Sequence, residues 1–365
     1  MHPEWLEKLA SEISEPDQTV AVAAQRRLDD KTKPLGSLGR VEEIAVKLAA
    51  IHGRVEFETE PRAVVVMAAD HGVASQGVSA YPQGVTVQMV RNFASGGAAI
   101  NVLARQMQVR TVIVDMGVAG GGPWPPEVRS LAVARGTADM TLGPAMSVAQ
   151  AEQALEAGAR LARELAADRA RVLATGEMGI ANTTAAATLT AVFTGRSPEE
   201  VTGHGTGIDD GVLTRKISVV KLALERNRPV PERPLEALAK VGGLEIAGLA
   251  GVILGAAAVR VPVLLDGFIT GAAALAAVAL VPSAQPFLFA AHRSREPGHA
   301  AVLAKLGLRP ILDLDLRLGE GTGAVLALPI LDAAGRILRE MASFESAGVS
   351  RGNPPEVLDK SAPGR

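Results

Sequence analysis

Short apolar runs rich in β-branched residues alternate with longer stretches of helical periodicity from residue 61 onward, and this alternation constrains the fold more than any other feature. Most runs are separated by segments whose apolar residues recur at three- and four-residue spacing, as they do in helices. Continuous apolar strands separated by helices imply a parallel sheet that helices cover on both faces. We therefore predict an α/β fold with a doubly wound, mainly parallel, six-stranded Rossmann-like sheet. The expected strands are 63–68, 111–115, 171–174, 261–265, 286–290 and 311–313, and the helices between them include 147–166, 210–225, 267–280 and 299–306.

The two ends of the chain have a helical pattern without strands. Segments 17–28, 38–51 and 325–343 carry apolar residues at helical spacing, and Pro16 and Ser37 fit positions just before a helix. We expect these ends to pack together as a small helical domain. The predicted organisation is residues 1–60 for the first part of this domain, 61–320 for a large α/β catalytic domain, and 321–365 for the C-terminal helix and tail that complete the small domain.

The composition excludes several classes of function. The formal net charge is −2 and no long block of like charge occurs, so neither nucleic-acid binding nor a basic membrane-surface helix is supported. The chain has no cysteine, which excludes disulfides and thiolate metal sites and fits a cytoplasmic location. The first residues lack the apolar stretch of a signal peptide. The most apolar region, 246–280, is interrupted by Arg260, Pro262 and Asp266, so we expect buried helices there and no membrane span.

The run Gly319-Glu320-Gly321 places one carboxylate between two glycines, after a strand-like stretch and before an apolar helical pattern. Glycines let the backbone pass close to a ligand. An acid beyond the carboxyl end of a strand lies where open α/β sheets bind their ligands. The alternative is that Glu320 merely occupies the first turn of the following helix, where the helix dipole favours an acid.

Polar or glycine-rich segments follow several of the other expected strands. Asp70-His71 follows the first strand. It fits either a turn in which both side chains have hydrogen-bond partners or a hydrogen-bonded pair beneath a site. A metal site is less favoured because the other histidines are scattered along the chain. Two glycine-rich loops, 175–184 and 202–210, lead into helices with hydroxyl side chains or Lys216 nearby, which is typical of a phosphate site. Tight helix–sheet packing is the alternative for each loop. Ser294 could bind phosphate or cap the helix that follows it.

Eight segments together resemble one enzyme family. They are T-K-P-L-G-S-L-G-R (32–40), A-A-D-H-G-V-A (68–74), V-S-A-Y-P-Q-G-V-T-V-Q-M-V (78–90), G-G-A-A-I-N-V-L-A-R (96–105), G-E-M-G-I-A-N-T-T (176–184), G-T-G-I-D-D (205–210), H-R-S-R-E-P-G-H (292–299) and R-L-G-E-G-T-G-A (317–324). Each is moderately specific alone, but all eight in this order are highly specific. The chain resembles nicotinate-nucleotide:dimethylbenzimidazole phosphoribosyltransferase, a family of cobalamin lower-ligand assembly. It departs from the family's usual residues at Lys31, Ala181 and His204, where leucine, glycine and arginine are common.

This resemblance implies that phosphoribose is transferred from nicotinate mononucleotide to 5,6-dimethylbenzimidazole, giving α-ribazole 5′-phosphate and nicotinate. It implies Glu320 as the catalytic base, with no cofactor and no metal. The substrate-binding residues that it implies are Ser79, Tyr81, Gln88, Glu177, Met178, Gly179, Gly205, Lys216 and Ser294. The loop 175–184 adds Asn182 and Thr183 as expected binding residues, and the glycine run around Glu320 adds Gly319. The family forms homodimers in which each active site borrows residues from the second subunit, so we expect a homodimer with a shared site here.

Two other functions stay open on the sequence. A related phosphoribosyltransferase could use another aromatic acceptor, such as a purine or a phenolic base, because only the pocket around Tyr81, Gln88 and Met178 would differ. A nucleotide-binding protein without enzymatic activity is the second alternative. The presence of Glu320 beside the nucleotide loops argues against it.

Overall fold

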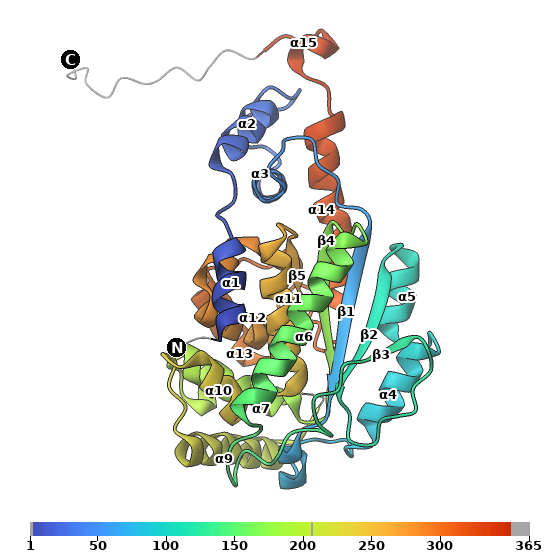
Figure 1. Cartoon of the computed structure of the whole chain (residues 1–365). Coiled ribbons are helices and arrows are strands. Elements are labelled where there is room, and N and C mark those ends of the chain that lie inside the picture. The colour runs from blue at the N-terminus through green and yellow to red at the C-terminus, as the bar shows by residue number, and fades with distance from the viewer. Residues whose placement is uncertain (1–2, 206, 352–365) are drawn as a thin grey trace, which may run out of the picture.

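The computed structural model describes residues 3–205 and 207–351, and its centre is a six-stranded sheet in which all strands are parallel (Figure 1). The strands are β1 (Arg62–Ala69), β2 (Arg110–Gly117), β3 (Val128–Ser130), β4 (Val172–Met178), β5 (Val263–Leu265) and β6 (Leu288–Ala290). Their order across the sheet is β3-β2-β1-β4-β5-β6. The direction of winding reverses between β1 and β4, and sheets of this kind bind ligands outside the carboxyl ends of the strands at that point. The predicted fold class is confirmed.

One expected strand is wrong, and one observed strand was not expected. Residues 311–313 form no strand, because Leu312 makes only an isolated parallel bridge to His292. Asp315 then has a left-handed φ of +56°, which ends any extended run. The remaining strand of the sheet is β3, which is only three residues long and pairs with β2. So short a segment, with polar residues at two of its three positions, has no recognisable strand pattern.

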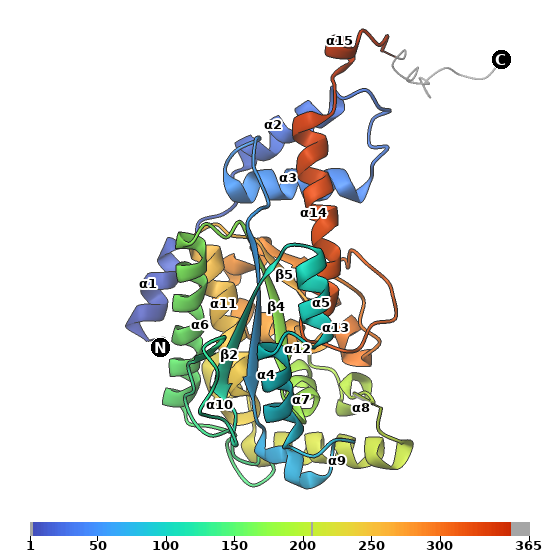
Figure 2. The same cartoon turned by 90° about the vertical axis from the view of Figure 1, so that its right-hand side faces the viewer.

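Helices cover both faces of the sheet. They are α1 (Glu4–Glu12), α2 (Gln18–Asp29), α3 (Arg40–His52), α4 (Val85–Ala94), α5 (Ala99–Gln106), α6 (Val148–Ala167), α7 (Asn182–Thr194), α8 (Pro198–Val201), α9 (Asp210–Asn227), α10 (Pro234–Val241), α11 (Leu244–Ala258), α12 (Phe268–Leu280), α13 (Pro297–Leu306), α14 (Thr322–Glu340) and α15 (Phe344–Ala347), with 3₁₀ turns at Gly72–Gln76 and Pro282–Phe287. On one face α11 and α12 contact the strands, and α6 packs over α11. On the other face lie α4, α5 and α14 (Figures 1 and 2).

The pair α6 and α11 shows why the chain is rich in alanine and glycine. α11 is buried on all sides from Leu244 to Ala257. A Cβ atom at Gly251 would lie 1.9 Å from the carbonyl oxygen of Leu155, so only glycine lets the two backbones approach this closely. No helix in the described part of the chain has the length and hydropathy needed to cross a membrane.

Helices from the two ends of the chain meet beyond the end of the sheet where the strands begin. α2 and α3 pack on each other and on α14, which runs from the sheet up to them (Figure 2). α1 instead packs on α11, and Trp5 donates a hydrogen bond to Glu152 Oε1 at 2.9 Å. Ser37 does not cap α3 as expected, because the Leu38 N–H is donated to Glu42 Oε1 at 2.9 Å and the helix begins after Gly39. The division of the chain into domains at residues 60 and 320 stays a prediction.

Candidate active site

The polar segments that follow the strands meet at the carboxyl edge of the sheet. Asp70 follows β1, Gly179 follows β4, Asp266 follows β5, and Ser294 lies four residues beyond β6. Glu320 reaches the same region from the loop that precedes α14, since its carbonyl oxygen lies against Gly176 of β4. The sheet topology therefore brings together residues that are up to 250 positions apart in the chain.

Three consecutive left-handed residues form the turn that carries Glu320. The φ angles are +84° at Gly319, +63° at Glu320 and +92° at Gly321. A non-glycine residue in this region is held against its preference at a cost of about 1–2 kcal/mol, and such strain is concentrated at functional sites. The surroundings also require glycine, because a Cβ atom at Gly319 would lie 2.2 Å from Glu177 Oε1 and one at Gly176 would lie 2.3 Å from the Glu320 carbonyl oxygen.

The carboxylate of Glu320 is buried, with 5% of the residue exposed, and its Oε2 accepts a hydrogen bond from the Ile100 N–H at 3.3 Å. Ile100 lies in the first turn of α5, so the acid faces the positive end of that helix. Burial raises the pKa of Glu320, and the bond from Ile100 partly opposes the rise. The alternative placement in the first turn of its own helix is wrong, because α14 begins at Thr322, after Gly321.

Two further buried acids lie beside Glu320. Glu177 accepts a hydrogen bond from the Asn182 amide, and burial raises its pKa to about 8, with the charges of Asp266, Glu245 and Glu320 adding to the effect. A carboxyl with this pKa is protonated at neutral pH. Sequence reasoning predicted Glu177 and Asn182 as site residues, and the structure places them in direct contact.

Asp266 is a member of the site that the sequence analysis missed. Its two carboxylate oxygens accept the N–H groups of Gly321 at 3.2 Å and Ala324 at 3.0 Å, so it caps α14 from outside and fixes the turn that carries Glu320. Burial raises the pKa of Asp266 to about 7. The available signal was a lone acid directly after the strand 261–265, inside the most apolar region of the chain.

Lys216 marks the part of the site that is suited to an anion. Its Nζ donates to Thr183 Oγ1 at 2.7 Å and to the Gly203 carbonyl oxygen at 3.2 Å. Burial lowers the pKa of Lys216 to about 8, and the charge of Glu296 partly opposes this. The structure thus brings the predicted residues Thr183, Gly205 and Lys216 together, since a Cβ atom at Gly205 would lie 3.3 Å from Lys216 Nζ.

Glu296 and Arg317 were not predicted, yet both hold the loop that contains Gly205. The Gly205 N–H is donated to Glu296 Oε1 at 2.8 Å, and Arg317 donates to the Gly205 carbonyl oxygen at 3.3 Å. A phosphate that bound the Gly205 N–H would have to displace Glu296. Ser294 does not cap α13, because that helix begins after Glu296; its Oγ instead accepts the Glu296 N–H at 3.3 Å.

The residues predicted for the aromatic base lie on the segment before α4 and on α4 itself. Ser79 Oγ accepts the Tyr81 N–H at 3.2 Å, and both Tyr81 and Gln88 are exposed. Thr86 connects this segment to the centre of the sheet, because its hydroxyl accepts the Ile180 N–H at 3.1 Å, two residues beyond Met178. No hydrogen bond or ion pair joins Ser79, Tyr81 or Gln88 to Glu320 within the described part of the chain.

His71 forms a buried pair beneath the loop after β4. Its Nε2 lies 2.7 Å from Glu245 Oε1. A Cβ atom at Gly179 would lie 3.3 Å from the His71 ring and 3.4 Å from Glu245 Oε1, so the pair supports this loop from below. The sequence predicted either a hydrogen-bonded turn or a hydrogen-bonded pair beneath the site for Asp70-His71, but the observed partner of His71 is Glu245 and not Asp70. Asp70 itself accepts the Ala119 N–H at 2.8 Å. Among residues 3–205 and 207–351, no three His, Asp or Glu side chains are grouped so as to hold a metal ion.

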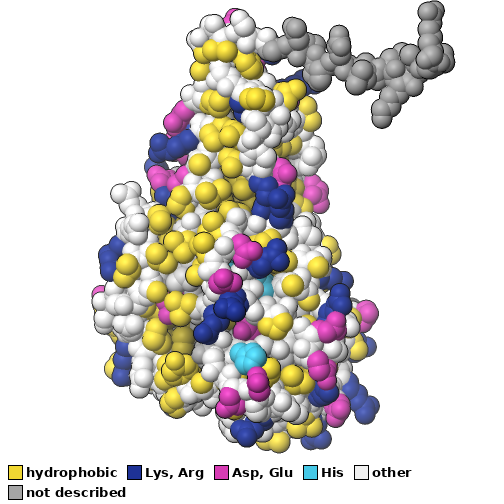
Figure 3. Space-filling view, turned by 180° about the vertical axis from the view of Figure 1, so that it is seen from behind, with side chains coloured by type: hydrophobic (Ala, Val, Ile, Leu, Met, Phe, Trp, Pro, Cys, Tyr) yellow, Lys and Arg dark blue, Asp and Glu magenta, His cyan; other side chains and the backbone are white. Residues whose placement is uncertain are grey.

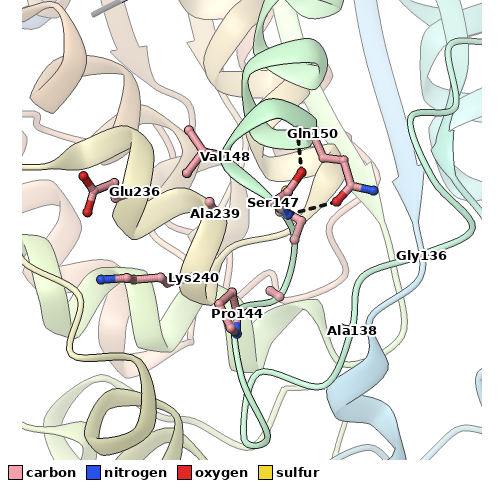
Figure 4. A pocket seen from close by; sticks show the side chains of 11 residues that line it. Gly136, Ala138, Pro144, Ser147, Val148, Gln150, Glu236, Ala239 and Lys240 are labelled. Atoms are coloured by element: carbon pink, nitrogen blue, oxygen red, sulfur yellow. Dashed lines mark hydrogen bonds between the residues drawn. The ribbon is translucent and has the colours of Figure 1, made fainter. Parts of the chain in front are cut away.

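One surface cavity lies away from these residues. It has a volume of about 600 Å³ and lies between the start of α6 and the helix α10, where Ser147 Oγ accepts the Gln150 N–H at 3.1 Å (Figure 4). None of the predicted site residues lines it. The cluster at the carboxyl edge of the sheet, where buried acids and a buried lysine gather, is therefore the better candidate for catalysis.

Comparison with known proteins identifies the family of the chain. The family model described as "Phosphoribosyltransferase" matches residues 13–349, which places the chain in the class of phosphoribosyltransferases. The nicotinate-nucleotide–dimethylbenzimidazole phosphoribosyltransferase of Chloroflexus aggregans is 58% identical over 92% of this chain and 95% of its own length, and that of Geobacter metallireducens is 50% identical over 95% and 98%. The crystal structure of the same enzyme from Thermus thermophilus superposes with a TM-score of 0.87 at 51% identity, over 92% of this chain and all of that one. The chain belongs to the nicotinate-nucleotide–dimethylbenzimidazole phosphoribosyltransferase family.

Proposed function

We propose that this enzyme transfers phosphoribose from nicotinate mononucleotide to 5,6-dimethylbenzimidazole, with Glu320 as the general base. The observation that carries the proposal is the buried Glu320 carboxylate, held on a strained Gly-Glu-Gly turn at the carboxyl edge of the sheet. The names of its relatives support the substrates. The products are α-ribazole 5′-phosphate and nicotinate.

The reaction needs help at the nucleophile more than at the leaving group. As the pyridinium–ribose bond breaks, its electron pair goes to the ring nitrogen, and nicotinate leaves without needing a proton. The lone-pair nitrogen of dimethylbenzimidazole forms the new bond to the anomeric carbon, and positive charge builds on that ring. Glu320 takes the proton from the other ring nitrogen. General-base assistance of this kind contributes roughly 10²–10⁴-fold to the rate.

The environments of Glu320 and Glu177 assign them different roles. Burial raises the pKa of Glu320, which makes its carboxylate a stronger proton acceptor than that of an exposed glutamate. Glu177, whose pKa is about 8, keeps its proton and serves as a hydrogen-bonding support. Pairs of acids whose surroundings separate their pKa values in this way are typical of sites that carry out proton transfer.

Lys216 would anchor the phosphate of the nucleotide, assisted by the hydroxyls of Thr183 and Ser294. A bound dianion favours the charged form of the lysine, so it offsets the burial that lowers the pKa of Lys216 to about 8. Anchoring at a distance from the reacting carbon supplies orientation, which contributes up to roughly 7–11 kcal/mol in well-aligned reactions.

A second copy of the chain would close the site against water. Apolar side chains beside the candidate site are exposed, including Tyr81 at 51%, Val102 at 51% and Leu318 at 56%. From behind, hydrophobic side chains also spread over the narrow upper part of the molecule and its junction with the wider part (Figure 3). The homodimer with a shared active site and the cytoplasmic location remain predictions.

The test is release of nicotinate from nicotinate mononucleotide, followed by mass spectrometry against a panel of aromatic acceptors. We expect release that depends on 5,6-dimethylbenzimidazole and a product with the mass of ribazole phosphate. Preferential use of a purine or of p-cresol would favour the related transferase with another acceptor. No release with any acceptor would contradict the proposal and favour a nucleotide-binding protein.

A further inference from the structure

A small cavity with a cationic lining lies between α3 and the edge strand β6. It has a volume of about 180 Å³, and residues 307–311, the start of the segment that leads to Glu320, close its third side. None of its lining residues belongs to the candidate active site. The motif T-K-P-L-G-S-L-G-R, to which the candidate site assigns no role, ends at Arg40 on the wall of this cavity.

Three cations and one acid line the cavity. The cations are Arg40, Lys47 and Arg309. Glu43 is the one acidic side chain among the described lining residues; 69% of its side chain is exposed, and it lies 3.9 Å from Arg40 Nε. Burial lowers the pKa of Arg40, and the charge of Arg309 adds to the effect while that of Glu43 opposes it. Burial and the charge of Arg40 lower the pKa of Lys47 to about 8.

Backbone carbonyl groups use only part of the donor capacity of these cations. Arg40 donates through its terminal nitrogens to the carbonyl oxygens of Arg309 and Pro310, and Lys47 Nζ donates to that of Leu288 at 2.6 Å. Arg40 Nε is buried and has no hydrogen-bond partner in the described structure. A lysine ammonium has three donors, so two remain on Lys47, although the ammonium also lies 4.4 Å from the centroid of the Phe289 ring. The guanidinium of Arg309 makes no ion pair with any described residue, although its side chain lines the same cavity.

We propose that this cavity binds a dianionic phosphoryl group, either as inorganic phosphate or as the phosphate of a small ester. Three cations around one hollow leave excess positive charge that is partly removed from water, which costs free energy. A bound oxyanion offsets this cost by forming charge-assisted hydrogen bonds with the cations. The volume admits a phosphate group but not a whole nucleotide, so the remainder of an ester would lie outside. Tethering of α3 to β6 and to residues 309–310 explains the carbonyl contacts. It does not explain why Arg40 Nε makes no hydrogen bond or why Arg309 lies at the same cavity.

Equilibrium dialysis of radiolabelled inorganic phosphate tests the proposal at fixed ionic strength. Arg309→Gln is the main variant, because Arg309 is exposed and its loss does not threaten the fold. Glu43→Gln removes the acid from the cavity wall. Arg110→Gln is the matched control, since Arg110 is an exposed arginine whose partner is Asp168. Lys216→Met separates this site from phosphate bound in the candidate active site.

We expect Arg309→Gln to weaken one class of phosphate binding about tenfold or more, as loss of a charge-assisted contact does. Glu43→Gln should tighten the same class, while Arg110→Gln and Lys216→Met should leave it unchanged. Ribose 5-phosphate that competes with labelled phosphate at this class would identify an ester as a ligand, and failure to compete would restrict the site to the free ion. Phosphate binding that is the same in Arg309→Gln as in the wild type would overturn the proposal.

Discussion

Gly176→Ala is the substitution whose effect follows most directly from the geometry of the turn that carries Glu320. The new Cβ atom would lie 2.3 Å from the Glu320 carbonyl oxygen and 2.8 Å from the Gly321 nitrogen, both of which are backbone atoms that cannot rotate away. Ordinary contact requires about 3.4–4 Å. The turn must therefore move by roughly 1 Å, and a misplacement of this size costs about 10²-fold in rate.

Two measurements follow from this displacement. A loss of about 10² in kcat corresponds to roughly 2.7 kcal/mol of activation free energy, and overpacking of a buried position lowers the free energy of unfolding by about 1–3 kcal/mol. Nicotinate release and urea unfolding would measure both. Gly143→Ala is the matched control, since no atom lies within 4 Å of its Cβ position. A Gly176→Ala enzyme with the turnover and stability of the wild type would refute the reasoning that the turn is held rigidly against β4.

Three further substitutions probe the groups around Glu320. Glu177→Gln should keep most of the activity, because the wild-type carboxyl is protonated at neutral pH. The folded-state pKa of Glu177, about 8, exceeds its ordinary value of 4.5, so the free energy of unfolding of the wild type falls as pH rises between these values. The variant should lose this dependence in urea unfolding at pH 5 and pH 8. Asp266→Asn should lower the free energy of unfolding by about 1–3 kcal/mol, because an amide cannot accept from both Gly321 and Ala324; an unchanged melting curve would count against the cap. Lys216→Met should weaken nicotinate mononucleotide binding by about 1.5–3 kcal/mol with the fold intact, and an equal Kd by calorimetry would exclude a phosphate contact.

The architecture could be predicted because the central strands have a local signature. β1 and β2 contain runs of valine and isoleucine, and β4 begins with the apolar run Val172–Ala174. All three strands are buried along most of their length, so a short apolar run identifies each of them. β3 and the segment 311–313 lack such a signature, since pairing there depends on neighbours that are distant in the chain. Likewise, Ser37 is a residue type that favours caps, but α3 begins only after Gly39, and Glu42 accepts the Leu38 N–H.

Individual site residues were predictable where glycine or hydroxyl patterns surround them, as at Glu320, Glu177 and Thr183. Asp266 and Glu296 were missed because their roles are tertiary: each accepts backbone N–H groups from a segment at least 55 residues away. A sequence shows that such an acid is present but not which N–H groups it will meet. The resemblance to the family supplied roles that the residues alone left open, and the role of Glu320 as base is still one of them.

The most direct test of the account is the single-turnover rate of Glu320→Gln with saturating nicotinate mononucleotide and 5,6-dimethylbenzimidazole. The account predicts a rate lower by about 10²–10⁴-fold with unchanged nucleotide binding, because the amide cannot accept the proton of the acceptor ring. A rate close to that of the wild type would contradict it and would leave the acid as a support for the turn alone.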